Sequence, residues 1–441
     1  MSIARKSLTD YFGQNAALVI SFVSGILVSM TFGTAGRGEY ALVLTANLLL
    51  INMTNMGIEV STRVFAGKRP KEVARIHTAG VMMIFVICIV VGTALLFFMD
   101  LVRGEFFPDI PERLLWLAAF LLPFSLYQLV WQGVMVGLGE IGWYARIYLW
   151  NRLIQSGAII VYIAFAAHPS VSWLLYLWVI VHITFVMISI IIMAKKYRLF
   201  ATITLDLIKK MLGFSWLVYA GNFAASLLHK FDMLMISRYV GESGAGIYNQ
   251  AATFSDKVLI ISGSLERATY NPATHADPKY APVLIQKVFR YNLYVNLIGA
   301  LGMYLFGSAV IRLLLPPEFT ESLFPLKFLL LSVIFMSCSR ILAIYFTAHL
   351  GKPQIPGIIN WTVLPLSIGI VYYLAKNYGL RGACIGTATV YGLHAFFFFG
   401  LFYKRNRQLG LSLFFVPNRE DFQYMLKKSK SFLNRILKKR K

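Results

Sequence analysis

The pattern G-x-x-G-x-G-x-Y occurs twice in the chain, as Phe32-Gly33-Thr34-Ala35-Gly36-Arg37-Gly38-Glu39-Tyr40 and as Val240-Gly241-Glu242-Ser243-Gly244-Ala245-Gly246-Ile247-Tyr248. Gly33 and Gly241 are 208 residues apart. A second pair of stretches, Leu138-Gly139-Glu140 and Leu350-Gly351-Lys352, repeats at an offset of 212 residues. Two matches at nearly equal offsets predict that the chain contains two copies of one architecture in the same orientation.

Both copies of the pattern are expected to form turns between apolar segments, because glycine adopts positive φ angles without steric strain. The predicted structural turn residues are Gly33, Gly36, Gly38, Tyr40, Gly241, Gly244, Gly246 and Tyr248. The tyrosine that ends each copy suits a membrane interface, where its ring contacts headgroups and its hydroxyl reaches water. A phosphate-binding loop is excluded, since no strand precedes the glycines and no Lys-Ser/Thr follows them.

The composition identifies a membrane protein. Hydrophobic residues make up 58% of the 441 residues, charged residues only 14%, and the mean hydropathy is +0.66. Apolar runs of membrane-spanning length recur along the chain. These properties exclude a soluble enzyme, a disordered chain and a disulfide scaffold.

We predict an all-α integral membrane protein with about twelve transmembrane helices in two six-helix bundles related by the parallel repeat. The predicted spans are 11–33, 38–62, 76–99, 112–138, 144–167, 172–194, 211–237, 245–265, 288–315, 323–348, 354–376 and 382–403. The predicted units are an N-terminal bundle (1–200), a C-terminal bundle (201–405) and a basic tail (406–441). Apolar residues at helical spacing among lysines predict an amphipathic helix in that tail, lying on anionic membrane lipids.

The net charge of +23 is a topology signal. Lys and Arg greatly outnumber Asp and Glu in the loops on the side of both termini, and the two signs balance on the other side. By the positive-inside rule both termini are cytoplasmic. Nucleic acid is not an expected partner, because no basic patch interleaves with exposed aromatic residues.

Polar residues within the predicted spans suggest a central cavity, because charges in a membrane usually face a bundle interior or water. Asn52, Asn55, Glu59 and Arg63 follow one helical face of the second span. Other candidates for the cavity are Arg152, Lys230, Asp232, Asp256, Lys257, Arg267 and Arg340. The alternative is that such residues only hold helices together, for example through ion pairs of Lys230 and Asp232 with Asp256 and Lys257.

No catalytic constellation is evident, so we do not expect an enzyme. The seven histidines are dispersed and show no metal-ligand spacing with carboxylates. No cofactor motif is present, and no metal site is predicted.

Twelve spans, the six-plus-six duplication and the repeated glycine turn resemble the multidrug/oligosaccharidyl-lipid/polysaccharide (MOP) exporter superfamily, and within it the polysaccharide or O-antigen (Wzx-type) flippases. Asp232, nine residues before Gly241, matches an aspartate that this group often carries. Leu350-Gly351-Lys352-Pro353 resembles its usual ending of span ten, apart from the leucine. The resemblance covers essentially the full length.

The resemblance implies a MATE-like fold that flips a lipid-linked oligosaccharide of undecaprenyl-diphosphate type across the bacterial inner membrane. It implies that the cavity residues bind the headgroup, the candidates being Asn52, Asn55, Arg63, Arg152, Lys230, Lys257, Arg267 and Arg340. Glu59, Asp232 and Asp256 are the candidates for coupling to a proton or sodium ion. Polysaccharide polymerase or assembly proteins are possible partners.

Three other functions stay open. A lipid II flippase shares the fold but usually has two further C-terminal spans, for which this chain has no room. A cation-coupled multidrug exporter shares the twelve spans, but its cavity is expected to be more acidic. A non-transporting scaffold of a polysaccharide synthesis complex would tolerate loss of the cavity charges.

Overall fold

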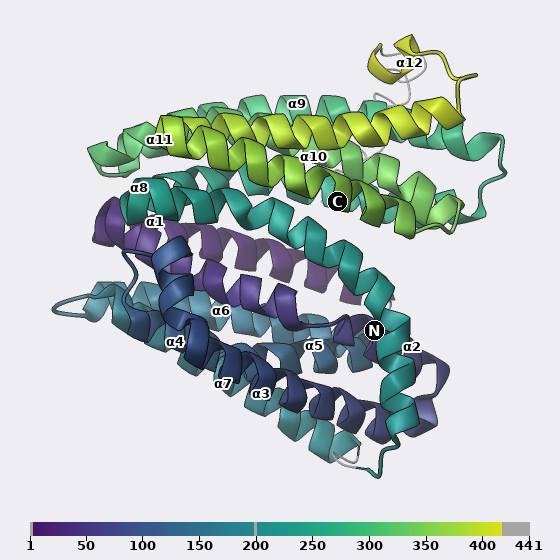
Figure 1. Ribbon diagram of the computed structural model, residues 1–441, viewed down its shortest axis with the longest axis horizontal. Coiled ribbons are helices and arrows are strands. Elements are labelled where there is room, and N and C mark those ends of the chain that lie inside the picture. Colours follow the sequence, from purple (N-terminus) through teal and green to yellow (C-terminus); the bar gives the residue numbers. More distant parts are fainter. Residues whose placement is uncertain (1–2, 198–200, 417–441) are drawn as a thin grey trace, which may run out of the picture.

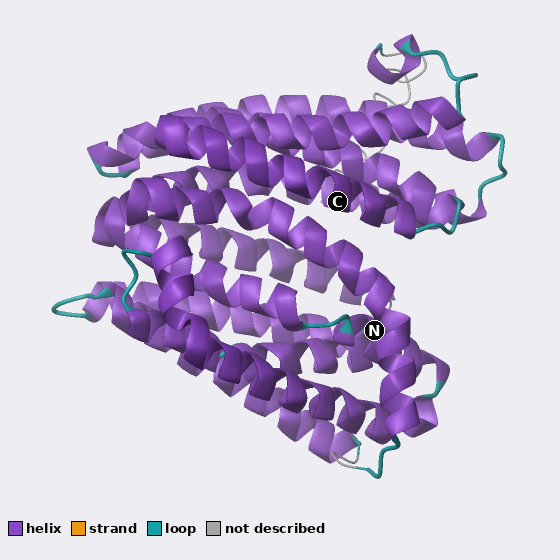
Figure 2. Ribbon diagram, viewed as in Figure 1, coloured by secondary structure: helices purple, strands orange, loops and turns teal. Residues whose placement is uncertain are grey.

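The computed structural model describes residues 3–197 and 201–416, and all regular structure in these ranges is helical (Figure 2). The helices are α1 (Ile3–Thr54), α2 (Ile58–Lys68), α3 (Val73–Phe106), α4 (Glu112–Phe120), α5 (Leu122–Gly137), α6 (Ile141–Phe165), α7 (Val171–Lys196), α8 (Leu205–His275), α9 (Tyr280–Leu314), α10 (Leu323–Ile344), α11 (Gln354–Arg405) and α12 (Ser412–Phe415). The short 3-10 helices η1 (Pro70–Glu72) and η2 (Pro317–Ser322) and the short π-helix η3 (Tyr345–His349) join some of them. The predicted basic amphipathic helix near the C-terminus lies outside the described residues.

The long helices have the length and surface of membrane spans. Eight helices among the described residues are long and apolar enough to cross a membrane, and a bent pair within α8 gives a ninth. Large apolar side chains point outward along them, as shown by exposures of 78% for Phe97, 72% for Leu96 and 72% for Ile298. Such surfaces are stable against lipid and not against water. The chain is therefore a multi-pass membrane protein, as predicted.

Three helices are each interrupted by one glycine with positive φ. The φ angles are 65° at Gly33 in α1, 83° at Gly241 in α8 and 56° at Gly379 in α11. These breaks fall between pairs of predicted spans. In the repeated pattern, only the first glycine of each copy makes the turn, and helical structure resumes directly after it.

The predicted span 38–62 is wrong in its second part. Helix α1 ends at Thr54, and α2 begins at Ile58 after Met56 and Gly57, which have φ angles of 43° and 71°. The side-chain oxygen of Asn55 accepts a hydrogen bond from the Gly57 N–H at 2.8 Å, which stabilises the break. Asn52 and Asn55 therefore do not share one continuous helix with Glu59 and Arg63.

The helices form two groups, which Figure 1 shows separating toward one end of the molecule. We call α1–α7 the N-terminal half and α8–α12 the C-terminal half. Helix α8 packs along α1 on one side and against α10 and α11 on the other, so it joins the halves. The first turns of α8 cross to the N-terminal half, where Leu207 and Met211 share a buried cluster with Trp131.

Candidate functional site

The two copies of the repeated pattern pack against each other where the halves meet. A Cβ atom on Gly38 would overlap the carbonyl of Glu242, and one on Gly246 would overlap the carbonyl of Thr34. Only glycine permits such backbone contact. The hydroxyl oxygens of Thr34 and Ser243 share a hydrogen bond at 2.9 Å. We call this contact between residues 32–40 and 240–248 the closed end.

Each half also holds the broken helix of the other half by a carboxylate. The Thr34 N–H, directly after Gly33, donates to Glu318 Oε1 at 2.7 Å. The Glu242 N–H, directly after Gly241, donates to Asp109 Oδ2 at 3.1 Å. Asp109 follows α3 and Glu318 follows α9, 209 residues later, so the two contacts are equivalent under the repeat.

An ion pair adds a further link between the halves near Asp109. Arg238, in the turn of α8 before Gly241, pairs with the carboxylate of Glu105 at the end of α3. The same guanidinium donates to the Glu105 carbonyl at 2.9 Å. Since charge-assisted hydrogen bonds are about twice as strong as neutral ones, the carboxylates and this arginine are the main polar stabilisation of the closed end.

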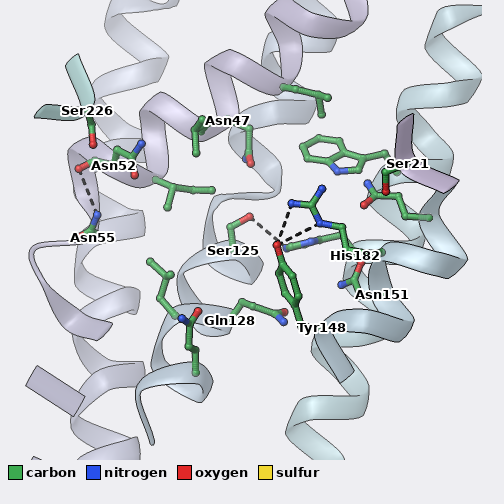
Figure 3. A pocket seen from close by; sticks show the side chains of 18 of the residues that line it. Ser21, Asn47, Asn52, Asn55, Ser125, Gln128, Tyr148, Asn151, His182 and Ser226 are labelled. Carbon is green, nitrogen blue, oxygen red and sulfur yellow. Dashed lines mark hydrogen bonds between the residues drawn. The ribbon is translucent and has the colours of Figure 1, made fainter. Parts of the chain in front are cut away.

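A cavity of about 1000 Å³ lies between the halves, and its lining runs from Arg37 at the closed end along α1 to Asn55, directly after this helix. Figure 3 shows polar side chains directed into this space from several helices. Eight amides form one group, and they are Asn47, Asn52, Asn55, Gln128, Gln132, Asn151, Gln155 and Asn222. Hydroxyls form the second group, and they are Ser21, Ser24, Tyr40, Ser125, Tyr144, Tyr148, Ser156, Ser226 and Thr253.

Helix α6 contributes an aromatic and cationic face to the cavity. Tyr144, Tyr148 and Arg152 are spaced four residues apart, which places them on one side of the helix. The two tyrosine rings stack with centroids 6.0 Å apart. An Nη atom of Arg152 donates to the Tyr148 hydroxyl at 2.9 Å, as Figure 3 shows by a dashed line. The wall thus offers flat rings together with hydrogen-bond donors.

The charge of the cavity wall is positive. Four cations line it, and they are Arg37, Arg152, Lys257 and Arg340. Glu59 is the single carboxylate in the described lining, and it is occupied by Arg63 and by Gln132, whose Nε2 donates to it at 3.2 Å. None of the four cations takes part in an ion pair among the described residues.

A second, much smaller cavity of about 80 Å³ lies within the C-terminal half. Asp232 is buried beside it and accepts hydrogen bonds from the Tyr248 hydroxyl, from the Thr387 hydroxyl at 3.3 Å and from the Met233 N–H at 2.7 Å. Asp256 and Lys230 also line it. The side chains of α8 thus carry two carboxylates into the interior of this half.

The structure distributes the predicted site residues over these two cavities. Asn52, Asn55, Glu59, Arg152, Lys257 and Arg340 line the large cavity, and Lys230, Asp232 and Asp256 line the small one. Arg63 and Arg267 line neither; Arg63 is held by Glu59, and Arg267 is exposed near the end of α8. No ion pair among the described residues joins Lys230 or Lys257 to Asp232 or Asp256, so the ion pairs that the alternative interpretation offered are absent there.

The expected interfacial position of the two motif tyrosines is wrong. Tyr40 is 8% exposed and lines the large cavity, while Tyr248 is 4% exposed and binds Asp232. The reason is that the helix resumes directly after Gly33 and Gly241, so that seven residues later the chain is already inside the protein. Interface tyrosines require a longer exposed turn.

Sequence reasoning missed Arg37 and most of the amides of the N-terminal half. The glycine spacing predicts a turn over the whole pattern, and this prediction puts Arg37 between two spans. A shorter turn would have put this charge inside a span. On α6, the repeated spacing of Tyr144, Tyr148 and Arg152 was a usable signal for a polar helix face.

Metal-ligating side chains do not gather in the described part of the chain, where no three His, Cys, Asp or Glu residues could hold an ion together. The chemistry available in the large cavity is hydrogen bonding, stacking on rings and attraction of negative charge. These three interactions are typical of a cavity that binds a ligand.

Comparison with solved structures identifies the fold. The fold is similar to lipid II flippase MurJ in an inward closed conformation, with a TM-score of 0.75, 14% identity, and coverage of 92% of this chain and 89% of that chain. It is similar to an inward-facing multidrug resistance MATE family transporter of the MOP superfamily, with a TM-score of 0.70, 15% identity, and coverage of 88% and 94%. A MOP superfamily transporter from Pyrococcus furiosus has a TM-score of 0.62 at 16% identity, with coverage of 91% and 95%. The MATE-like fold is thus confirmed.

The family follows from the sequence itself. Residues 4–269 match the polysaccharide biosynthesis protein family, and the chain belongs to it. This match covers more than half of the chain, including both copies of the glycine pattern. No curated protein matches the chain by sequence.

Proposed function

We propose that the protein flips a lipid-linked oligosaccharide of the undecaprenyl-diphosphate type across the bacterial inner membrane, for the synthesis of a surface polysaccharide such as O-antigen. The observation that carries this proposal is the wall of the large cavity, which combines eight amides with four cations that lack a carboxylate partner in the described chain. Membership of the polysaccharide biosynthesis family supports the same substrate class.

The cavity chemistry suits both parts of such a headgroup. Amides and hydroxyls donate to and accept from sugar hydroxyls, and the stacked rings of Tyr144 and Tyr148 offer a flat apolar surface to a sugar face. Arginine and lysine pair strongly with phosphate oxygens. A cavity for cationic drugs would instead need free carboxylates, and Glu59 is already occupied by Arg63.

The expected topology supports loading of this cavity from the cytoplasm. If α1, α8 and α11 each cross twice at their glycine breaks, the chain crosses twelve times and both termini lie on one side. The excess of Lys and Arg then makes that side cytoplasmic. The closed end follows the first crossing and is therefore extracytoplasmic. The higher TM-score with an inward-facing MATE transporter (0.70) than with an outward-facing one (0.64) supports this orientation.

Transport then requires the closed end to open while the opposite end closes. The reciprocal contacts of Glu318 and Asp109 hold the closed end through hydrogen bonds that cross between the halves. Rocking of the two halves would break both contacts together and expose the cavity to the other side. The lipid tail would stay in the bilayer throughout.

The coupling ion, a proton or sodium, is assigned to the small cavity. Asp232 and Asp256 line it without an ion-pair partner in the described chain. Lys230 shares the same cavity, so a change in the charge of these aspartates would be felt by a neighbouring cation. Glu59 is the weaker candidate, because Arg63 and Gln132 already bind it.

A strain that lacks the protein tests this proposal, with its lipid-linked intermediates extracted and its surface glycans analysed. Loss of one surface polymer, with its lipid-linked precursor accumulating, is the expected result. Accumulation of lipid II would favour the lipid II flippase, whose fold is similar over 92% of this chain. Intact glycans with altered sensitivity to cationic drugs would reject the flippase in favour of an exporter.

A further inference from the structure

Arg37 is one of the four cations of the large cavity, and the proposed function gives it no individual role. Its side chain is only 6% exposed, yet it lines the large cavity directly beside the closed end. It lies between Gly36 and Gly38, one residue from the point where the two halves touch through their backbones. A charged group is therefore held at the blind end of the cavity.

The hydrogen bonding of this guanidinium is incomplete. A guanidinium has five N–H donors in a planar fork. In the described chain one Nη atom donates to the Thr253 hydroxyl at 2.9 Å, and the buried Nε has no hydrogen-bond partner. No ion pair among the described residues includes Arg37. A buried cation without an anionic partner is strongly destabilising, so a ligand is the natural source of the missing acceptor.

The other half of the protein supplies a second cation on the same side. Thr253 and Lys257 are one helical turn apart on α8, and both line the large cavity. The Lys257 ammonium lies 5.9 Å from the ring centre of Phe22 and has no described carboxylate partner. Three residues before Thr253, the buried Nε2 of Gln250 is also an unpartnered donor.

We infer that Arg37, Thr253 and Lys257 form an anion site shared by the two halves, which takes a phosphoryl group of the transported headgroup. A tetrahedral phosphoryl group accepts several hydrogen bonds at once, matching the planar fork of arginine and the ammonium of lysine. Gly25 lies beside this place, since a Cβ atom there would lie 3.7 Å from an Nη atom of Arg37, at ordinary contact distance. The assignment of the anion to the headgroup rests on the proposed function.

The site has a mechanical consequence. Arg37 joins the halves through its hydrogen bond to Thr253. An anion that accepts hydrogen bonds from the Arg37 guanidinium competes with the Thr253 hydroxyl for these donors. The competition takes place where the two halves must separate. Binding at this site is thus linked to opening of the closed end.

Thermal unfolding of the purified full-length protein with inorganic pyrophosphate tests the inference. Wild type is expected to show a rise in melting temperature that saturates with pyrophosphate and weakens with salt. Arg37→Gln is expected to raise the melting temperature of the empty protein, because a buried unpaired charge is removed, and to weaken pyrophosphate binding at least tenfold. Lys257→Gln serves as the second variant if Arg37→Gln does not fold.

Arg267→Gln is the matched control, since this arginine lies on α8 outside both cavities, and it should behave as wild type. Equal pyrophosphate binding by wild type, Arg37→Gln and Lys257→Gln would overturn the inference. So would stabilisation by glucuronate and not by pyrophosphate, which would identify an acidic sugar as the anion. Either outcome leaves the proposed function open, because the accumulation of a lipid-linked precursor in the deletion strain tests that separately.

Discussion

Gly38 and Gly246 occupy equivalent positions of the two repeats, and their backbones lie in direct contact where the halves of the protein meet. A Cβ atom on either residue would overlap a carbonyl group of the opposite half. The repeat thus brings two copies of one sequence pattern together as a symmetric closure. This backbone contact requires glycine at both positions, because any side chain there would separate the halves at the closed end.

Gly246→Ala should destabilise the protein by about 1–3 kcal/mol, the usual effect of overpacking a tight contact. The added methyl group meets the Thr34 carbonyl, which belongs to backbone and cannot rotate away. Thermal unfolding in detergent measures the effect. Gly302→Ala on α9 is the matched control, because no atom lies within 4 Å of a Cβ there. An equal melting temperature for both variants would contradict the backbone contact.

Glu318→Ala should loosen the closed end. It removes the acceptor of the Thr34 N–H, and a hydrogen bond to a charged group contributes about 1.5–3 kcal/mol. A cysteine introduced at Ser243 reports opening through its reaction rate with a water-soluble thiol reagent. The rate should rise in Glu318→Ala, rise further with Asp109→Ala, and stay unchanged in Glu321→Ala, an exposed residue of the same turn. Uniform rates would show that the carboxylates do not hold the closed end.

Asp232→Asn should abolish ion coupling without unfolding the protein. Asparagine keeps a side-chain acceptor for Tyr248 and Thr387 but cannot change charge. Headgroup transport by the variant should become independent of an imposed proton or sodium gradient, as measured in proteoliposomes. Asp206→Asn, which changes an exposed carboxylate paired with Lys210, is the control. A variant that retains the full gradient dependence would exclude Asp232 as the coupling residue.

Arg340→Gln should lower the amount of surface polysaccharide at least tenfold, because Arg340 lines the cavity as an unpaired cation in the described chain. The abundance of the protein in the membrane should not change. Complementation of the deletion strain measures both quantities. Arg267→Gln should complement fully. If polymer is restored equally by both variants, the cavity cations do not bind the substrate, as a scaffold role requires.

The sequence predicted the helical class, the long apolar segments and the turns at Gly33 and Gly241 well, because glycine spacing and apolar length are local signals. It misjudged the extent of the turn at residues 32–40, since one positive φ angle at Gly33 suffices and Arg37 is already inside the cavity. The break at Asn55–Gly57 depends on a side-chain hydrogen bond, which periodicity does not reveal.

The cross-half contacts of Asp109 and Glu318 join segments more than one hundred residues apart, so no local pattern contains them. Their spacing of 209 residues nevertheless equals the repeat offset within one residue. A search for acidic residues separated by the repeat offset would therefore have identified Asp109 and Glu318 as an equivalent pair. The direction of the remaining polar side chains depends on helix packing, which needs the fold.

Flipping by the purified protein in proteoliposomes is the most direct measurement of its activity. The vesicles contain a fluorescent lipid-linked oligosaccharide, and an impermeant glycosidase is added outside. With wild type the glycosidase should cleave the whole pool, including molecules that began in the inner leaflet, and with Arg340→Gln it should cleave only the outer-leaflet pool. Cleavage restricted to the outer leaflet with correctly folded wild type would contradict the proposal that this protein is a flippase.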